Sequence, residues 1–350
     1  MKLNEVLIAP LALITLNSNM IVAAIPTISL DLGVSVPYLL MYLVAAYLLI
    51  NLIFLIPAGI LGDYLGHKNA SIVGHVIIII SSTLVFGSQS IEVVVASRIG
   101  AAIGGSILVP NLTAYIYSNA SVGNHSNNRT MSMISAVVGV SVAAGPFLGG
   151  ILTTTLGWAS ILYINAPFFI LSMLVLIFAA NKKKQKYEEL PQNKEMSLRN
   201  RKFSILMLIT TSAIIYGLLS FIPPILEQMY AGKATIIGAV TSTMAFCMAG
   251  SAFYVAKFTR ANSNTKLLFT SFLLLIFLVL LFSLFHQSIL YIVITCIGVG
   301  ITAGIVFSIS QTKVMEISIL ASRGRTAGIT GALRYLGGII GVAFVSLVLK

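Results

Sequence analysis

The sequence predicts an all-α membrane protein, a bundle of about eleven transmembrane helices in two pseudo-symmetric halves. Composition is the first reason: of 350 residues, 58% are hydrophobic and 9% are charged, with a mean hydropathy of +1.01. Soluble domains carry about 25% charged residues, so this chain could not cover a water-facing surface. The second reason is that apolar runs of roughly 20 residues, the length that crosses a bilayer as a helix, recur to the last residue.

Each apolar run is expected to be a helix, because backbone groups in lipid must be satisfied internally and no barrel-like alternation of residues appears. The hydrophilic segment "NKKKQKYEELPQNKEMSLRNRK", residues 181–202, separates six runs from five. The eleven runs cover residues 6–30, 38–60, 71–89, 92–118, 131–153, 160–181, 203–226, 235–256, 267–285, 288–311 and 326–349.

This division predicts three parts: a six-helix N-terminal half over 1–181, a basic cytoplasmic linker over 182–202 and a five-helix C-terminal half over 203–350. Paired halves are a hallmark of membrane transporters. The second half is one helix short of the first. A natural eleven-helix variant, a truncated product and an incomplete sequence all account for that difference.

The positions of lysine and arginine set the predicted orientation, because cytoplasmic loops carry an excess of these residues. With a cytoplasmic N-terminus, the outer side holds only Lys233 and the terminal Lys350. The cytoplasmic side then holds the linker cluster together with Lys2, Lys68, Arg129, Lys257, Arg260, Lys266, Lys313, Arg323 and Arg325. The net charge of +12 therefore follows from the orientation of a multi-pass protein in the cell membrane, where the basic side is attracted to anionic lipid. No nucleic-acid partner is expected.

The stretch "GILGDYLGHKNA", residues 59–70, is a polar turn between the second and third runs. Gly59 and Gly66 allow close helix approach and a tight turn. Asp63, with Lys68 nearby, is a carboxylate at a cytoplasmic helix end. It is suited to bind a helix N-terminus or an arginine in one conformation only, as a latch. The alternative is a solvated turn with a topological lysine.

Arg98 lies about two turns into the fourth run, where a charge is costly and is expected to face the bundle interior. It is a candidate contact for substrate or a partner of a proton carrier. The alternative is that its side chain extends to the outer interface. Arg334, in the last run and nearer the cytoplasmic side, has the same two interpretations: an interior contact or a side chain that extends to the interface.

The fifth run contains "AAGPFLGG", residues 143–150. Pro146 removes an intrahelical hydrogen bond, while Gly145, Gly149 and Gly150 present a face of small residues. A helix of this kind bends and packs closely, which suits a gate. Ordinary helix packing is the alternative.

Carboxylates are scarce, and none of them falls at the predicted depth of the membrane centre. Among them, Glu227, followed by Gln228, is the acid nearest the outer mouth of the bundle. In the first run, Asn17 and Asn19 are candidates for hydrogen bonds to a substrate. His75 titrates near neutral pH when accessible, although a lone histidine on a helix is more often a packing residue.

Several functional classes are not expected. Cys247 and Cys296 lie inside apolar runs, match no metal or disulfide spacing, and are expected to be small core residues. The chain has no phosphate-binding loop, no zinc-binding H-E-x-x-H and no catalytic triad with a plausible site. We therefore expect no enzymatic activity, no cofactor and no metal.

Five stretches in order resemble the major facilitator superfamily, in particular its multidrug, or drug:proton antiporter, exporter branch. The spacing G-x-L-G-D-x-x-G-x-K over 59–68 is similar to the signature loop between its second and third helices. The segments "SRIGAAIGGSILVP" (97–110), "AGPFLGG" (144–150), "GWASILYINAP" (157–167) and "GRTAGITGALRYLGGIIGVA" (324–343) resemble its fourth, fifth, sixth and penultimate helices.

The chain also departs from these patterns. Tyr64 and His67 stand where the signature loop has arginines, which is expected to weaken the latch. Ala101 and Ala102 replace the usual Gln and Gly of the fourth helix. Asn17 stands where the exporter pattern has Asp, and Asn cannot carry a proton. Proton coupling is therefore expected to be weak or to depend on Glu227.

The resemblance implies a central cavity between two halves and secondary transport by alternating access, with export of hydrophobic or cationic small molecules, as a monomer. Partners would be the small-molecule substrate, protons and membrane lipid. A carrier for a specific metabolite or organic anion is the second interpretation, which Arg98 and the absence of deep acids favour. A non-transporting membrane sensor or a truncated remnant is the third.

Overall fold

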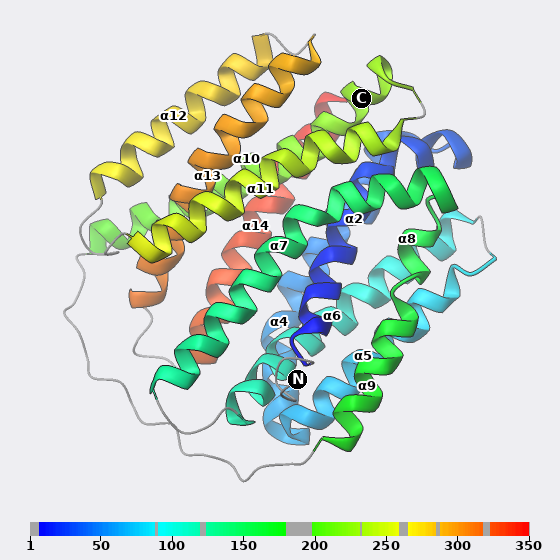
Figure 1. The fold of residues 1–350 in the computed structure, drawn as a ribbon, viewed down its shortest axis with the longest axis vertical. Helices are drawn as coiled ribbons and strands as arrows, with labels where there is room; N and C mark the ends of the chain where they lie inside the picture. The colour runs from blue at the N-terminus through cyan, green and yellow to red at the C-terminus, as the bar shows by residue number, and fades with distance from the viewer. Residues whose placement is uncertain are drawn as a thin grey trace.

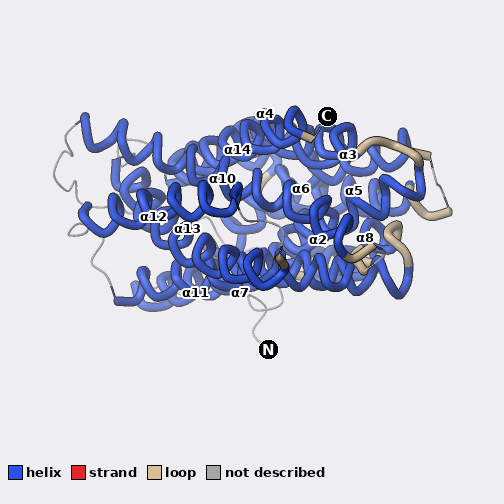
Figure 2. Tube along the Cα trace, turned by 90° about the horizontal axis from the view of Figure 1, so that it is seen from above, coloured by secondary structure: helices blue, strands red, loops and turns tan. Residues whose placement is uncertain are grey.

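The computed structural model describes residues 7–87, 90–119, 124–179, 198–231, 233–258, 265–284, 288–317 and 323–349. These residues form helices joined by short turns, and no strand occurs among them (Figure 2). Eight of the described helical segments are long and apolar enough to cross a membrane, and two shorter apolar helices accompany them. The predicted all-α membrane fold is confirmed.

Before residue 180, the described chain makes six helical passes. The second pass joins three consecutive helices, and the sixth joins two. The helices are α2 (Ala9–Leu32), α3 (Val36–Leu39), the π-helix η1 (Leu40–Ala45), α4 (Ala46–Leu65), α5 (His67–Leu84), α6 (Ile91–Asn119), α7 (Asn124–Leu156), α8 (Ser160–Tyr163) and α9 (Ala166–Phe178).

After residue 197, the described chain makes five passes: α10 (Leu198–Met229), α11 (Ala234–Phe258), α12 (Thr265–Leu284), α13 (Ile289–Ile317) and α14 (Arg323–Val348). The first of these helices begins at Leu198, within the predicted linker. Residues 182–197 of that linker lie outside the described residues. The order of six passes and then five follows the predicted order of apolar runs.

The bundle has two ends, which we name by their connections. The basic end is where α2 begins and where the 59–70 turn joins α4 to α5. The far end carries α3, α8 and the turn between α10 and α11. In Figure 1 the far end lies at the upper right, and the helices of the two halves diverge toward the lower left.

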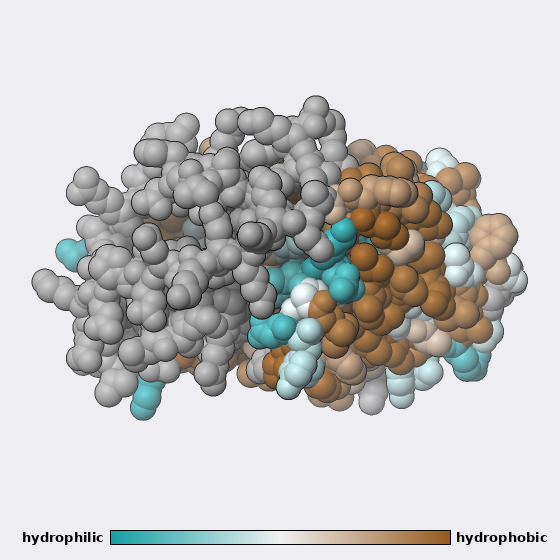
Figure 3. Space-filling view, turned by 90° about the horizontal axis from the view of Figure 1, so that it is seen from below, coloured by the Kyte–Doolittle hydropathy of each residue, from teal (hydrophilic) through white to brown (hydrophobic). Residues whose placement is uncertain are grey.

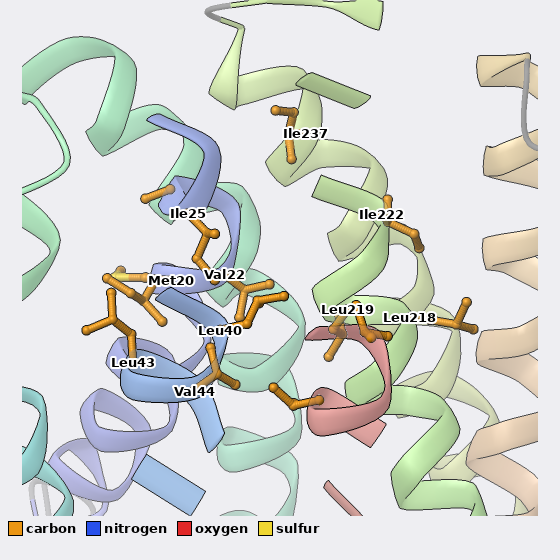
Figure 4. Packing of buried hydrophobic residues seen from close by; sticks show 14 of the residues in the cluster. Met20, Val22, Ile25, Leu40, Leu43, Val44, Leu218, Leu219, Ile222 and Ile237 are labelled. Carbon is orange, nitrogen blue, oxygen red and sulfur yellow. The ribbon is translucent and has the colours of Figure 1, made fainter. Parts of the chain in front are cut away.

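Three hydrophobic clusters fill the described bundle. The largest, which we call the far cluster, includes residues of both halves between the far end and the middle, among them Ile25, Leu43, Leu219 and Ile237 (Figure 4). A second cluster, around Leu112, contains residues of the first six passes alone. A third, around Val306, contains residues of the last five passes alone. The two halves therefore share a core toward the far end and have separate cores toward the basic end.

The outer faces of the helices expose large apolar side chains, as expected for a surface in lipid. Phe344 and Phe178 are examples, with 67% and 84% of their surfaces exposed. Figure 3 shows hydrophobic residues covering much of the described part of the face seen from below. Since a soluble domain rarely exposes apolar patches of this extent, the surface agrees with the composition.

Candidate functional site

The two halves meet along a seam whose tightest contact joins α7 to α11. A Cβ atom added at Gly150 would lie 2.3 Å from the carbonyl oxygen of Ala234, and one added at Gly238 would lie 2.2 Å from that of Pro146. Real Cβ atoms do not approach oxygen so closely, so only glycine fits at either position. Small residues therefore allow the two backbones to touch.

Hydrogen bonds add to this contact. The backbone N–H of Phe147, the residue after Pro146, donates to Ser242 Oγ of α11 at 2.8 Å. Nearer the far end, Thr154 Oγ1 and Thr235 Oγ1 lie 2.9 Å apart. Proline disturbs the hydrogen bonding of its own helix, so a partner on the opposite half stabilises the distorted turn of α7.

The other face of α7 packs on α2, within the first half. A Cβ atom at Gly145 would lie 2.7 Å from Asn19 Cβ, and one at Gly149 would lie 2.3 Å from the carbonyl oxygen of Met20. Asn19 Nδ2 donates to the Thr15 carbonyl of its own helix. The predicted glycine–proline motif thus has two close-packed faces, with Gly145 and Gly149 on one and Gly150 and Pro146 on the other.

A second contact along the seam joins α4 to α14. A Cβ atom at Gly338 would lie 2.9 Å from both Leu48 Cδ1 of α4 and Tyr216 Cδ2 of α10. Ser346 Oγ donates to the Pro37 carbonyl at the far end. Three helices from the two halves therefore meet at Gly338, near the middle of the bundle.

Arg98 of α6 is 1% exposed, which agrees with the prediction that it faces the interior. Its Nε and Nη2 atoms both donate to the Leu43 carbonyl at 3.3 Å, and its Nη1 donates to Asn17 Oδ1 at 3.4 Å. Its guanidinium carbon also lies 4.3 Å from the centre of the Tyr47 ring. The charge is held by a carbonyl, an amide and an aromatic face, all of them uncharged.

The carbonyl that this arginine contacts belongs to the π-helix η1. Leu43 lies within η1, Leu40–Ala45, where the hydrogen bonding of the α-helix is altered. Such single-turn π segments in long helices occur frequently at functional sites. Here the altered turn faces a buried guanidinium.

The side-chain amide of Asn17 makes two hydrogen bonds, one as a donor and one as an acceptor. Its Nδ2 donates to the Ile161 carbonyl at 2.9 Å, while its Oδ1 accepts from Arg98. A carboxylate can only accept, so an Asp at this position would face the Ile161 carbonyl without a proton to donate. The hydrogen bond from Asn17 to the start of the sixth pass therefore explains why an amide suits this position, where the exporter pattern has an acid.

Aromatic residues continue from Arg98 across the seam. Tyr47, whose ring lies under Arg98, belongs to the far cluster, and Tyr216 and Tyr335 of the other half pack against the same cluster. Arg334 of α14, partly buried, lies with its guanidinium carbon 5.3 Å from the centre of the Tyr335 ring. Arg334 forms a side-chain hydrogen bond with Tyr335, and Tyr216 lies beside Gly338, one turn further along α14. Two arginines are thus connected by three tyrosines, and we call this set the arginine–tyrosine row.

The 59–70 turn is fixed within the first half. Gly66, at φ 81°, adopts a conformation that favours glycine and ends α4. Lys68 Nζ donates to the carbonyls of Ile177 and Ala179, where a lysine neutralises the C-terminal end of α9. Gly59 has open space around it, and Asp63 is exposed. The predicted partner region of the latch, 324–327, lies outside the side chains that the structure describes.

A second tie in this turn involves two residues that the motif does not include. Asn111 Nδ2 donates to the carbonyls of Ala58 and Ile107, so its Oδ1 accepts from His67 Nδ1 at 3.0 Å. A Cβ atom at Gly62 would collide with that amide. His67, which stands in place of an arginine, therefore has a defined role in the turn.

Two further candidates lie away from the row. Glu227 is partly buried and Gln228 exposed at the far end of α10. The described contacts of Arg98 do not include Glu227. His75 is fully buried between the Ser71 carbonyl, 2.8 Å from Nδ1, and Ser172 Oγ, 2.9 Å from Nε2. Its two nitrogens are both satisfied in the neutral form, as expected for a packing residue.

Comparisons with known proteins agree with this architecture. The family model of the Major Facilitator Superfamily matches residues 10–342. The chain is 31% identical over 155 residues to the tetracenomycin C resistance and export protein of Streptomyces glaucescens, covering 44% of this chain and 28% of that protein. It is 32% identical over 161 residues to the riboflavin transporter RibZ of Clostridioides difficile, covering 46% and 35%. The matched segments thus span about a third of these relatives.

A solved structure shares the fold. The crystal structure of a bacterial homologue of the human lysosomal transporter Spinster, in an inward-facing and unoccupied conformation, has a TM-score of 0.73 at 16% identity. The match covers 99% of this chain and 80% of that one. With the family model matching nearly the full length, the chain belongs to the Major Facilitator Superfamily.

Proposed function

We propose that this protein is a secondary transporter that exports hydrophobic small molecules by alternating access. The observation that carries the proposal is the distribution of its cores: one cluster shared by both halves toward the far end and separate clusters toward the basic end. Two bodies that pack together at one end and have independent cores at the other are suited to rock about a site between them.

The similarity to a protein named for resistance and export supports the direction of transport. A riboflavin transporter among the relatives supports small organic molecules more broadly. The six-pass half, the 182–202 linker and the five-pass half would be the moving parts and their connection. The cluster that the two halves share is apolar, which favours substrates with a hydrophobic body.

Orientation follows from the basic connections, and we place the protein in the cell membrane with its basic end in the cytoplasm. In that orientation the arrangement of the cores corresponds to a state closed toward the outside. The inward-facing conformation of the similar Spinster homologue supports this assignment. Asp63 would act as the latch in the opposite state, when the far end opens and the basic end closes.

Proton coupling is proposed to be weak or to depend on Glu227. Asn17 cannot carry a proton, and the described carboxylates Asp31, Asp63 and Glu92 are exposed. Glu227 is the partly buried one. Replacing Glu227 by Gln should reduce transport driven by a pH gradient, with exchange of substrate at equal pH unchanged. Unchanged gradient-driven transport would exclude Glu227 from the proton path.

A carrier for an organic anion is the second candidate. Arg98 and Arg334 both lie in the membrane interior, and the groups that act on them are tyrosines, an amide and a carbonyl. Buried cationic residues in membrane proteins commonly line substrate paths.

Reconstituted vesicles test the proposal. The purified protein would be inserted into vesicles that contain the cation ethidium, neutral riboflavin or the anion 2-naphthoate, with and without an imposed pH gradient. We expect protein-dependent flux of at least one probe that saturates with concentration and falls in the Asp63→Asn variant. Absence of saturable flux for all three probes, in both directions, would favour a non-transporting sensor.

A further inference from the structure

The arginine–tyrosine row carries an inference about the charge of the substrate. We infer that Arg334, together with Tyr216 and Tyr335, forms a subsite for the carboxylate group of an aromatic acid. The inference rests on the proposed transport function and specifies the ligand chemistry of the same seam. Its three residues come from α10 and α14, where these helices meet α4.

Arg334 is only partly satisfied by the described protein, through a side-chain hydrogen bond with Tyr335. Its Nε atom is buried without a hydrogen-bond partner in the described structure. The polar groups described beside it are phenols, those of Tyr335 and Tyr216. An arginine in a membrane interior is expensive unless it is paired, and a carboxylate would offset that expense with charge-assisted hydrogen bonds.

Geometry favours a planar oxyanion. The guanidinium group presents several N–H donors in a rigid fork that matches the two oxygens of a carboxylate, which an ammonium or a hydroxyl does not. The tyrosine hydroxyls add neutral donors beside that fork. The rings of Tyr47, Tyr216 and Tyr335 supply flat apolar surfaces next to it, so an aromatic body on the acid would find stacking partners.

Arg98 has a different part in this arrangement. It is 1% exposed, and its described donors already reach Leu43 and Asn17. It therefore does not offer a first contact to a ligand. Its fixed positive charge lies behind Tyr47, on the other side of the row, and raises the potential that an anion meets there. Both charges repel a cation.

Direct binding tests the inference independently of transport. The wild-type protein in lipid nanodiscs would be titrated with radiolabelled 2-naphthoate, with unlabelled 2-naphthylmethanol and 2-naphthylmethylammonium as competitors of the same shape. We expect naphthoate to bind at least tenfold more tightly than either competitor. Arg334→Gln should weaken naphthoate binding by about tenfold or more, because it removes a charged hydrogen-bond donor.

Three further variants complete the design. Arg334→Lys keeps the charge without the fork and should bind naphthoate with intermediate affinity. Tyr216→Phe removes one hydroxyl and should weaken binding a few-fold, which keeps a test available if Arg334→Gln does not fold. Lys266→Gln removes an exposed charge from α12 and should bind as the wild type does.

Competition by the ammonium compound as strong as that by naphthoate would overturn the inference. Equal naphthoate binding by the wild type and by folded Arg334→Gln or Tyr216→Phe protein would also overturn it. The proposed function fails separately: if naphthoate binds as expected but vesicles show no saturable flux of any probe, the subsite stands and transport does not. If vesicles show saturable flux of ethidium but naphthoate does not bind, transport stands and the subsite does not.

Discussion

The far half and the basic half of the bundle are built differently. Toward the far end, the two halves of the chain share one hydrophobic cluster and touch backbone to backbone at Gly150 and Gly238. Toward the basic end, each half has its own cluster, and ties such as that of Lys68 to α9 stay within one half. Among the described residues, the two halves therefore share their core toward the far end, while toward the basic end their cores are separate and the α4–α14 contact continues, as at Leu55 and Gly331.

This difference indicates what a change of state requires. In the proposed cycle, opening the far end means separating a shared core and the α7–α11 contact, while closing the basic end brings together two halves that each have a core of their own there. Contacts formed at the basic end must offset those lost at the far end. Asp63, exposed in the described state, is a group available for that purpose.

The largest expected effect comes from filling the α7–α11 contact. Gly238→Ala places a methyl group against the Pro146 carbonyl, and overpacking of this kind costs about 1–3 kcal/mol. We expect a lower thermal midpoint and a loss of transport. Gly250→Ala, in the same helix but with open space around it, is the matched control and should leave both unchanged. Equal effects of the two substitutions would show that the contact is not tight.

The next effect concerns the basic end. Asp63→Asn should lower transport about tenfold or more, in line with the loss of one charge-assisted contact. The thermal midpoint should stay the same, because this side chain is exposed in the described state. The two measurements together separate a latch that acts in the other state from a solvated turn. Normal transport by this variant would identify 59–70 as an ordinary turn.

A smaller change is expected at Ser242. Its hydroxyl accepts from Phe147 N–H across the seam, and such a bond contributes about 1 kcal/mol. Ser242→Ala should therefore shift the population toward the state open at the far end, measured by spin-label distances between the halves. Thr243→Val removes a hydroxyl that bonds within its own helix and should not shift it. A shift of the same size in both variants would assign the effect to α11 itself.

The smallest effect should follow from Lys68→Met. Its two bonds to α9 carbonyls stabilise a helix end by about 0.3–1 kcal/mol, and both partners belong to the first half. Stability should fall slightly, with no change in the distances between the halves. A change in those distances would show that the turn contributes to the seam.

The sequence predicted the helices well, because lipid leaves the backbone no other regular structure and the length of each apolar run approximates its span. It did not predict η1, which no glycine or proline within Leu40–Ala45 signals. The contact of this segment with Arg98, through the Leu43 carbonyl, depends on how the two helices are rotated about their axes. Run length contains no information on rotation.

Only some residues of the candidate site could be predicted from the sequence. Arg98, Pro146 and Arg334 could be predicted as candidates, because charges and helix breakers are unusual in apolar runs. Ser242, Tyr216 and Asn111 could not, because hydroxyls, phenols and amides are ordinary in such runs. Their roles depend on partners far away in the chain. The bond from Phe147 to Ser242, for example, spans 95 residues.

Locking the far end gives the most direct test of alternating access. Thr154 and Thr235 bring their hydroxyl oxygens to 2.9 Å across the seam, so cysteines at both positions should form a disulfide. The background would carry Cys247→Ala and Cys296→Ala. We predict that the oxidised double variant binds probe from the basic side but transports none, and that reduction restores transport. Full transport by the cross-linked protein would contradict a mechanism in which the far end opens.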